Sequence, residues 1–169
     1  GISTNFRREV GAHGISDRGI WRVHQFSKVE QVILCKPEDS KKMHKEILDN
    51  AIKIFEKLKI PFRVIDICTG DIGTVAARKY DIEVWMPSTN KWKEVVSASN
   101  CKSYQSVRLN MRYRTPEGTD FPHTLNSTAV ATTRALAAIL ENNQTDNGDV
   151  IIPKVLRKWM GDQEIIKAR

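Results

Sequence analysis

The N-terminal part of the chain carries residues whose side chains could together hold a nucleotide. Arg7 and Glu9 precede a glycine-containing connector at residues 11–18, and Arg22 and Phe26 follow it. Side chains of a strand alternate between its faces, so we expect Arg7 and Glu9 on one face, with a hairpin returning Arg22 over them. Arginine forks bind phosphate oxygens, a carboxylate can accept from an exocyclic amine, and an aromatic ring can stack on a base. The stretch favours a nucleotide site, and an exposed hairpin with surface charges is the alternative.

A second stretch with chemical potential runs from His123 to Arg134 and reads as a strand end that passes into a helix. Its small residues would let a substrate lie close to the start of the helix, where main-chain amides favour anions. We expect Arg134 to lie about two turns into this helix, within reach of a triphosphate. A helix that only packs on the domain would explain the small residues, but not the order of Asn126 followed by an arginine.

A third stretch, residues 91–98, is predicted to be a strand that carries Glu94 and Ser97. A carboxylate beside a bound triphosphate can hold magnesium, which prefers oxygen ligands and keeps some of its waters and phosphate ligands. The alternative for Glu94 alone is a glutamate on the surface of a strand.

The order of residues in two of these stretches resembles a known family. Phe-Arg-x-Glu at residues 6–9 and Arg-x-His-Gln-Phe-x-Lys-x-Glu at residues 22–30 are similar to motif 2 of the class II aminoacyl-tRNA synthetases, and in detail to seryl-tRNA synthetases. Residues 123–134 resemble motif 3 of the same class. Ser127 and Ala129 depart from it, because the family often has glycine at these places.

Connecting phrases extend the resemblance over nearly the whole chain. Residues 93–101 match the family phrase Lys-Glu-x-x-Ser-x-Ser-Asn-Cys, and residues 68–71 match its Cys-Thr-Gly-Asp turn. The chain starts directly at motif 2, whereas family members carry upstream a helical arm that binds tRNA and motif 1, which builds a dimer interface. The resemblance therefore implies a fragment or a shortened relative, and a homodimer in the full-length protein.

The resemblance assigns the ATP-binding roles residue by residue. Arg7 would hold the α-phosphate and the substrate carboxylate, and Arg22 and Arg134 would grip the outer phosphates. Glu9 would accept a hydrogen bond from the adenine amine, and Phe26 would stack on the adenine ring. Arg7 and Arg134 are the residues expected to act in catalysis.

The remaining roles concern the metal and the amino acid. Glu94, helped by Ser97, would hold Mg²⁺. Glu30 would meet the amino or hydroxyl group of serine, and Asn126 and Thr128 would complete a small polar pocket. The implied reaction is the ATP- and Mg²⁺-dependent activation of serine to seryl-adenylate, followed by transfer of the seryl group to tRNA(Ser).

The expected elements agree with an α+β domain built on an antiparallel sheet flanked by helices, as in the class II synthetase catalytic fold. We treat residues 1–169 as a single domain, the C-terminal portion of such a core. Strands are predicted at 5–10, 19–26, 29–35, 61–67, 82–86 and 91–98, and helices from 39 or 40 to about 58, at 74–79, at 103–112 and through 139–141.

Composition bounds the function without deciding it. A formal net charge of +7 suits a polyanionic partner such as RNA or a nucleotide. The helix at 103–112 is basic, and contact with the RNA acceptor end and a structurally paired basic face explain it equally well.

No apolar run is long enough to cross a bilayer, and no basic-then-apolar leader opens the chain. Three cysteines without Cys-x-x-Cys spacing read as reduced thiols of a cytoplasmic protein.

Two other functions stay open at this level. A non-catalytic relative could keep the fold and bind an adenylate, RNA or a protein partner. A ligase that loads an amino acid onto another carrier is also conceivable, although the sequence offers no convincing Cys/His/Glu set for the zinc ion that some such ligases use.

Overall fold

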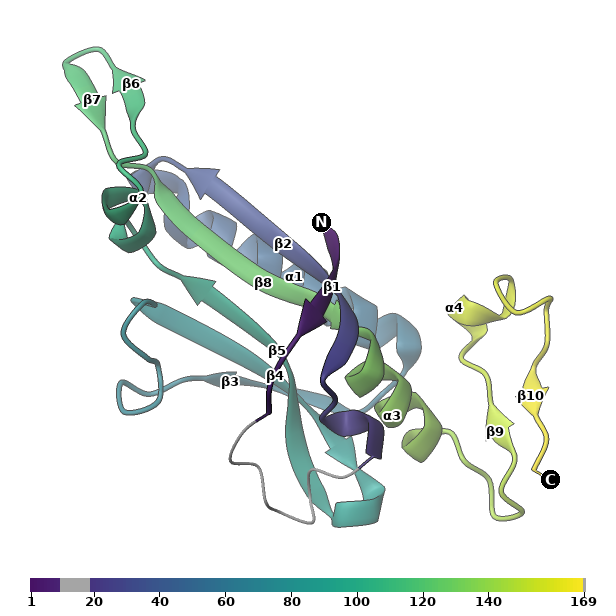
Figure 1. Ribbon diagram of the computed structural model, residues 1–169. Helices are drawn as coiled ribbons and strands as arrows, with labels where there is room; N and C mark the ends of the chain where they lie inside the picture. The colour runs from purple at the N-terminus through teal and green to yellow at the C-terminus, as the bar shows by residue number, and fades with distance from the viewer. Residues whose placement is uncertain (10–18, 169) are drawn as a thin grey trace.

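The computed structural model describes residues 1–9 and 19–168, and its centre is a six-stranded antiparallel sheet (Figure 1). The strands lie in the order β1-β2-β8-β5-β4-β3, so the N-terminal half of the chain contributes both edges of the sheet. The expected α+β class, an antiparallel sheet with flanking helices, is confirmed. The sheet consists of β1 (Ile2–Phe6), β2 (Gln25–Cys35), β3 (Phe62–Asp66), β4 (Arg78–Met86), β5 (Lys91–Asn100) and β8 (His123–Ala131).

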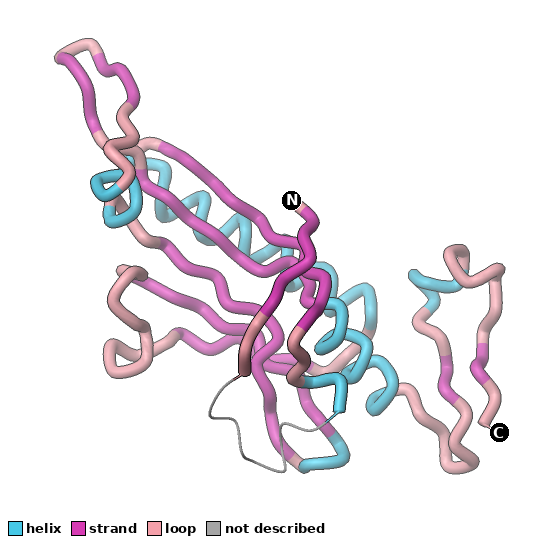
Figure 2. Tube along the Cα trace, viewed as in Figure 1, coloured by secondary structure: helices cyan, strands magenta, loops and turns pink. Residues whose placement is uncertain are grey.

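Helix α1 (Ser40–Leu58) covers one face of the sheet and forms the core with it (Figures 1 and 2). Its apolar side chains recur at helical spacing, which gives the helix one buried side and one charged side. Lys59 follows with a left-handed φ of 56° and ends the helix. The buried core side chains include Ile47, Ala51, Phe55 and Leu58 of α1 with Ile82, Val84, Val96 and Ala98 of β4 and β5.

Helix α3 (Thr132–Asn142) follows β8 without a connecting loop and contacts β4, β2 and the 3₁₀ turn η2. The alanines Ala135, Ala137 and Ala138 are buried on its inner side, where small side chains allow close packing. The remaining elements are η2 (Gly19–Trp21), η3 (Pro37–Asp39), η4 (Pro87–Thr89), α2 (Tyr104–Arg108), β6 (Tyr113–Thr115), β7 (Gly118–Asp120), β9 (Val150–Ile151), α4 (Lys154–Arg157) and β10 (Ile165–Ile166). In the parts of the chain that the structure describes, no helix is both long and apolar enough to span a membrane.

Several predicted elements differ in the structure. The helix expected at residues 74–79 is wrong: β4 already begins at Arg78, and the Ala77 amide donates to the Asn100 carbonyl over 2.8 Å. The ladder with β5 thus takes the main-chain groups that a helix would have used. The helix expected at 103–112 is shorter in the structure and consists of α2, which ends at Arg108. Asn110 adopts a φ of 50° and turns the chain away.

β6 and β7 form a short hairpin, and residues 116–117 are its turn. Gly118 has a φ of 142°, a conformation that favours glycine, at the position where the chain reverses. The hairpin projects from one end of the sheet, away from α3 (Figure 1).

The strands expected at 5–10 and 19–26 lie farther from the connector than predicted, and β2 also takes in the strand expected at 29–35. β1 ends at Phe6, and the residues from Gly19 form η2 before β2 begins at Gln25. Val10 and the connector at residues 11–18 lie outside the described residues.

Candidate functional site

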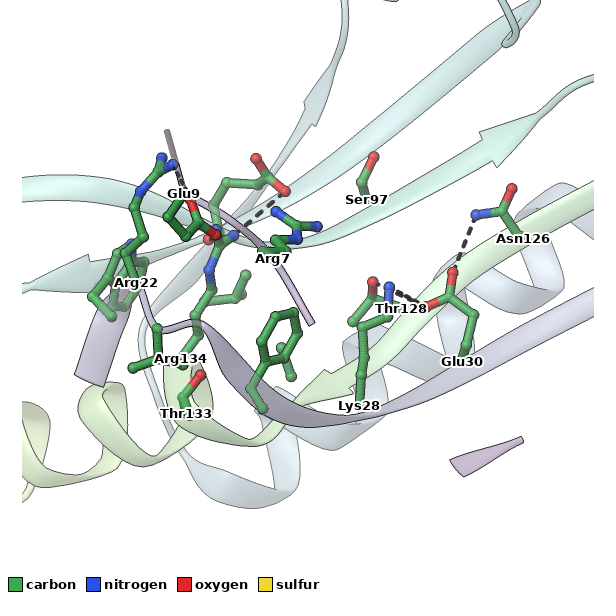
Figure 3. Close-up of a pocket in the computed structure, with 16 residues that line it drawn as sticks. Arg7, Glu9, Arg22, Lys28, Glu30, Ser97, Asn126, Thr128, Thr133 and Arg134 are labelled. Atoms are coloured by element: carbon green, nitrogen blue, oxygen red, sulfur yellow. Dashed lines mark hydrogen bonds and ion pairs between the residues drawn. The ribbon is translucent and has the colours of Figure 1, made fainter. Parts of the chain in front are cut away.

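A polar pocket of about 340 Å³ lies against the strands of the central sheet and the first turn of α3 (Figure 3). Every residue predicted for the site lines this one pocket, although these residues come from separate parts of the chain. They are Arg7, Glu9, Arg22, Phe26, Glu30, Glu94, Ser97, Asn126, Thr128 and Arg134.

Three sheet strands and the segments next to them position these side chains. On β2, alternation places Phe26, Lys28 and Glu30 on the pocket face. A register shift in the β2–β8 ladder pairs Val29 with Val130 and Glu30 with Thr128. Ala129 is therefore the extra residue of a β-bulge, and the bulge brings Thr128 directly opposite Glu30.

The pocket has two chemically different ends (Figure 3). Arg7, Arg22 and Arg134 gather at one end, together with Glu9. Glu30, Asn126, Thr128 and Lys28 lie at the other end. The first end suits an anion of high charge, and the second suits a small ligand with hydrogen-bonding groups.

Arg7 is held by main-chain contacts beyond the end of β1. Its amide donates to the His24 carbonyl over 2.8 Å, and its own carbonyl lies 3.0 Å from Nδ1 of the His24 ring. The guanidinium carbon of Arg7 lies 5.6 Å from the centroid of the Phe26 ring, within the range of a cation–π contact. These contacts join Arg7, which precedes the connector, to His24 and Phe26, which follow it.

Glu9 and Arg22 form an ion pair, with Oε2 of the glutamate 2.6 Å from Nη1 of the arginine. Glu9 has a φ of 51°, so the strand alternation used to predict its direction does not apply there. Its side chain nevertheless lines the same pocket as Arg7. The prediction of a shared face is correct in its result and wrong in its reason.

Arg134 is the third residue of α3, not two turns into the helix as predicted. The strand before it continues through Ala131, which leaves less chain for the helix than the run of small residues suggested. Its Nη1 donates to the main-chain oxygen of Glu94 over 2.9 Å, and its guanidinium carbon lies 5.6 Å from the ring centroid of Trp21. Burial lowers the pKa of Arg134, with Glu94 acting in the opposite direction, but an arginine stays protonated in either case.

Glu94 and Ser97 supply oxygen atoms to the pocket wall formed by β5. Burial raises the pKa of Glu94, and the positive charge of Arg134 partly offsets that rise. Two oxygen donors near a cationic, phosphate-sized end are compatible with Mg²⁺, which needs only one or two protein ligands when phosphates and water supply the rest.

At the other end, Glu30 is the centre of a hydrogen-bond network. Its Oε1 accepts from Nδ2 of Asn126 over 3.1 Å, and its Oε2 accepts from the Thr128 hydroxyl over 3.3 Å. Lys28 places its Nζ 2.9 Å from Oε2 of the same carboxylate. The network fixes the rotamer of Glu30 before a ligand arrives, as selective recognition of a small polar ligand requires.

Lys28 and Trp21 line the pocket but were not predicted as site residues. Lys28 could have been found, since it stands between Phe26 and Glu30 on the same strand face. Trp21 lies in a 3₁₀ turn, where no periodic pattern indicates the direction of a side chain. It contacts two cations, Arg134 and Lys93, whose nitrogen lies 5.1 Å from the ring centroid.

The basic side chains of the helix expected at 103–112 lie away from this pocket. Arg108 stacks on Tyr104 at 4.4 Å and Arg112 on Phe121 at 4.3 Å, each measured from guanidinium carbon to ring centroid. Both arginines therefore have local aromatic partners, as the structural explanation for this cluster requires.

The geometry can be compared with known proteins. Residues 1–143 match the model of the tRNA synthetase class II core domain (G, H, P, S and T). A serine–tRNA ligase of Methanospirillum hungatei is 60% identical over 169 residues, which cover 98% of this chain and 40% of the relative. The chain thus spans about two fifths of the length of the curated relatives that it matches.

Two solved structures resemble the chain over nearly its whole length. Seryl-tRNA synthetase from Pyrococcus horikoshii complexed with ATP has a TM-score of 0.94 and 53% identity, over 99% of this chain and 38% of that one. Cytoplasmic serine–tRNA ligase from Naegleria fowleri in complex with AMP has a TM-score of 0.92 and 44% identity, over 99% of this chain and 40% of that one. Because the family model matches residues 1–143 of the 169, the chain belongs to the class II core domain family of tRNA synthetases.

Proposed function

We propose that this chain is the ATP- and serine-binding core of a serine–tRNA ligase. The observation that carries the proposal is the two-ended pocket, in which a group of arginines and the network around Glu30 share one cavity. The first end suits a triphosphate and the second a small hydroxylated amino acid, so one site can hold both substrates of adenylate formation. The similarity to serine–tRNA ligases that were solved with ATP and with AMP supports the same assignment.

In this proposal the cationic end binds ATP. Arg7 holds the α-phosphate and the serine carboxylate, while Arg22 and Arg134 bind the outer phosphates through their planar forks. Phe26 stacks on the adenine ring, and Glu9 accepts a hydrogen bond from the adenine amine. Because Glu9 is already paired with Arg22, the same contact orients both the arginine and the carboxylate.

In the first step, a carboxylate oxygen of serine attacks the α-phosphorus, the bond from that phosphorus to the bridging oxygen breaks, and pyrophosphate leaves. The attacking carboxylate carries no proton to remove, so the step needs positioning and charge neutralisation more than a protein base. Arg7 and Arg134 supply both. In the second step, a ribose hydroxyl at the 3′ end of tRNA(Ser) attacks the activated carbonyl, and AMP leaves.

Serine is selected at the other end of the pocket. Glu30 meets the amino or hydroxyl group of serine, and Asn126 and Thr128 hold the Glu30 carboxylate in place. A site built to hydrogen-bond a substrate hydroxyl rejects alanine, because its own polar groups would remain buried and unpaired. Threonine would add a methyl group to the same small space.

Glu94 and Ser97 are the residues that would hold Mg²⁺. Within residues 1–9 and 19–168, no three His, Cys, Asp or Glu side chains gather to hold a metal ion by themselves. The proposed site therefore relies on phosphate oxygens as further ligands, which is typical of Mg²⁺ in nucleotide sites. When bound, the ion would neutralise charge on the triphosphate.

The proposal extends to the partners of the whole protein: tRNA(Ser) as the acceptor, a second copy of the subunit in a homodimer, and the cytoplasm as its compartment. The formal net charge of +7 favours approach to an RNA.

Calorimetric titration of the chain with a non-hydrolysable seryl-adenylate analogue tests the proposal, beside the matched alanyl and threonyl analogues. We expect the seryl analogue to bind at least about tenfold more tightly than the other two, as loss of a hydroxyl contact or a steric clash would produce. Circular dichroism establishes that the titrated chain is folded. A folded chain that binds no analogue, or that binds all three equally, would contradict the assignment.

A further inference from the structure

Lys28 is a cation of the pocket to which the proposed mechanism gives no role. It lies on β2 between Phe26 and Glu30, and all three side chains line the pocket. Successive side chains on one face of a strand stand about 7 Å apart. Lys28 therefore lies between the residue proposed to stack on adenine and the residue proposed to meet serine.

In this structure the lysine is turned toward the Glu30 end of the pocket (Figure 3). Its Nζ lies 2.9 Å from Oε2 of Glu30, the same oxygen that accepts from the Thr128 hydroxyl over 3.3 Å. The second oxygen, Oε1, accepts from Nδ2 of Asn126 over 3.1 Å. A side-chain ammonium thus occupies the place beside Glu30 that the ammonium group of an amino acid would need.

The amino group of serine competes with Lys28 for this carboxylate. A carboxylate binds an ammonium group more strongly than it binds a neutral hydroxyl, because both partners are charged. Two ammonium groups on one carboxylate oxygen would lie only a few ångströms apart, where like charges repel. Binding of the serine amino group at Glu30 therefore favours departure of Lys28 from that oxygen.

A displaced Lys28 has a second anion within its reach. In the proposed complex the base lies on Phe26 and the amino acid lies at Glu30, so the α-phosphate that joins them passes Lys28. Lysine has a compact ammonium group on a flexible four-carbon stem, and it can therefore change partners without movement of the main chain. Arg22 and Arg134 are already paired with glutamates at the other end of the pocket.

We propose that Lys28 is a further catalytic residue that exchanges partners when the substrates bind: the serine ammonium group displaces it from Glu30, and it then pairs with the α-phosphate. The inference rests on the proposed function, since it concerns the same serine and ATP site. After the exchange, Lys28 adds a second cation beside Arg7 where the serine carboxylate approaches the phosphate. A lysine that only oriented Glu30 would stay on that carboxylate and would not contact the phosphate.

The test is calorimetric binding of two seryl-adenylate analogues to the unmodified chain and to Lys28→Met. One analogue has a sulfamoyl linker, which carries a negative charge in place of the α-phosphate, and the other is N-methylated at this linker and is neutral. Lys28→Met should weaken binding of the anionic analogue about tenfold, because a charge-assisted contact is lost. It should strengthen binding of the neutral analogue about twofold to fivefold, because the ligand no longer has to break a partly exposed ion pair.

Two further variants sharpen the test. Lys91→Met is the matched control, since Lys91 is an exposed strand lysine at the start of β5 and lies outside the pocket. It should leave the affinity for both analogues unchanged. Lys28→Arg keeps the positive charge, so its affinity for the anionic analogue should be higher than that of Lys28→Met. Circular dichroism establishes that each variant is folded.

The outcomes separate this inference from the proposed function. If the folded, unmodified chain binds neither analogue, the proposed function fails. If it binds both and Lys28→Met weakens both by similar factors, Lys28 only supports Glu30 and the exchange is wrong. A loss for the anionic analogue without a gain for the neutral one would mean that Lys28 is not displaced, and an unchanged affinity for the anionic analogue would mean that it does not reach the phosphate. Either result would overturn the exchange.

Discussion

Arg134 and Glu94 are joined twice: Nη1 of the arginine donates to the glutamate main-chain oxygen over 2.9 Å and lies 3.7 Å from its carboxylate. The first turn of α3 is thereby tied to β5, and the arginine proposed to bind phosphate is placed beside the carboxylate proposed to bind Mg²⁺. Because the main-chain contact uses one nitrogen of the fork, the others stay available for a ligand. The contact orients the arginine in the absence of a ligand.

Replacing Arg134 should weaken ATP binding strongly. We expect Arg134→Ala to raise the Kd for ATP about tenfold to a hundredfold, since a charge-assisted contact with phosphate is lost. Arg134→Lys should recover only part of this loss, because an ammonium group lacks the planar fork. Calorimetry measures the Kd values, with Arg63→Ala as the control for loss of an exposed arginine outside the pocket. An Arg134→Ala chain that is folded and binds ATP normally would remove this residue from the site.

Replacing Phe26 should affect the nucleotide through its base. Phe26→Leu should weaken ATP binding about threefold to tenfold, the usual value of an aromatic contact beyond area burial, whereas Phe26→Tyr should retain most of the affinity. Inorganic triphosphate has no base, so its affinity should not change in either variant. A parallel loss for ATP and triphosphate would indicate that the change acts through Arg7, which lies over the ring.

Replacing Glu30 should separate serine recognition from ATP recognition. Glu30→Gln removes the charge that Lys28, Asn126 and Thr128 surround. We expect the affinity for the seryl-adenylate analogue to fall at least about tenfold, and the affinity for ATP to change less than about twofold. Glu46→Gln, on the exposed side of α1, is the matched control. Equal losses for both ligands would mean that Glu30 supports the whole pocket and does not read the amino acid.

Stability should depend on pH through His44. The residue is 3% exposed and lies 2.9 Å through Nε2 from the Ala98 carbonyl, and burial lowers its pKa below the ordinary 6.5. Below about pH 6.5 the unfolded chain binds a proton that the folded chain refuses. The contribution of His44 to the free energy of unfolding should therefore be complete above that pH. It should fall as the pH drops toward the lowered pKa of the folded state, by at most about 1.4 kcal/mol per pH unit.

The contribution of His44 is measured by urea denaturation of the unmodified chain and of the His44→Gln variant, each at pH 7.5, 6.5 and 5.5. The glutamine of His44→Gln can still donate to the Ala98 carbonyl but does not titrate. The free energy of unfolding of this variant should therefore change less with pH than that of the unmodified chain. The pKa of His123 is also lowered by burial, and its contribution is common to both series and cancels. Identical slopes would show that His44 does not carry the dependence.

The parts of the site that could be predicted from sequence are those in which direction follows from local geometry or from family resemblance. Phe26 and Glu30 share a face because strand side chains alternate, and the same rule identifies Lys28. No spacing in the sequence indicates that Glu30 meets Asn126, which is 96 residues away. Their pairing depends on β2 lying beside β8, and only the family resemblance supplied that topology.

The errors arose where long-range pairing overrides local preference. Residues 74–79 contain good helix formers, yet the Ala77 amide is used by Asn100 on the neighbouring strand. Arg134 was placed too deep in its helix because small residues do not distinguish a strand end from a helix start. The β-bulge at Ala129 has no sequence signal of its own, although it decides which residue faces Glu30.

The junction of β2 and β8 also has a consequence for how the protein reaches its native state. These strands come from opposite halves of the chain, and the end of the pocket around Glu30 exists only where they meet. Contacts between residues so far apart in the sequence form slowly, because a long loop must close, at a cost in entropy, before the contacts contribute stability. A molecule that binds across this junction would bind only chains in which β2 and β8 are paired, so the recovery of ligand binding during refolding would measure the rate of this pairing.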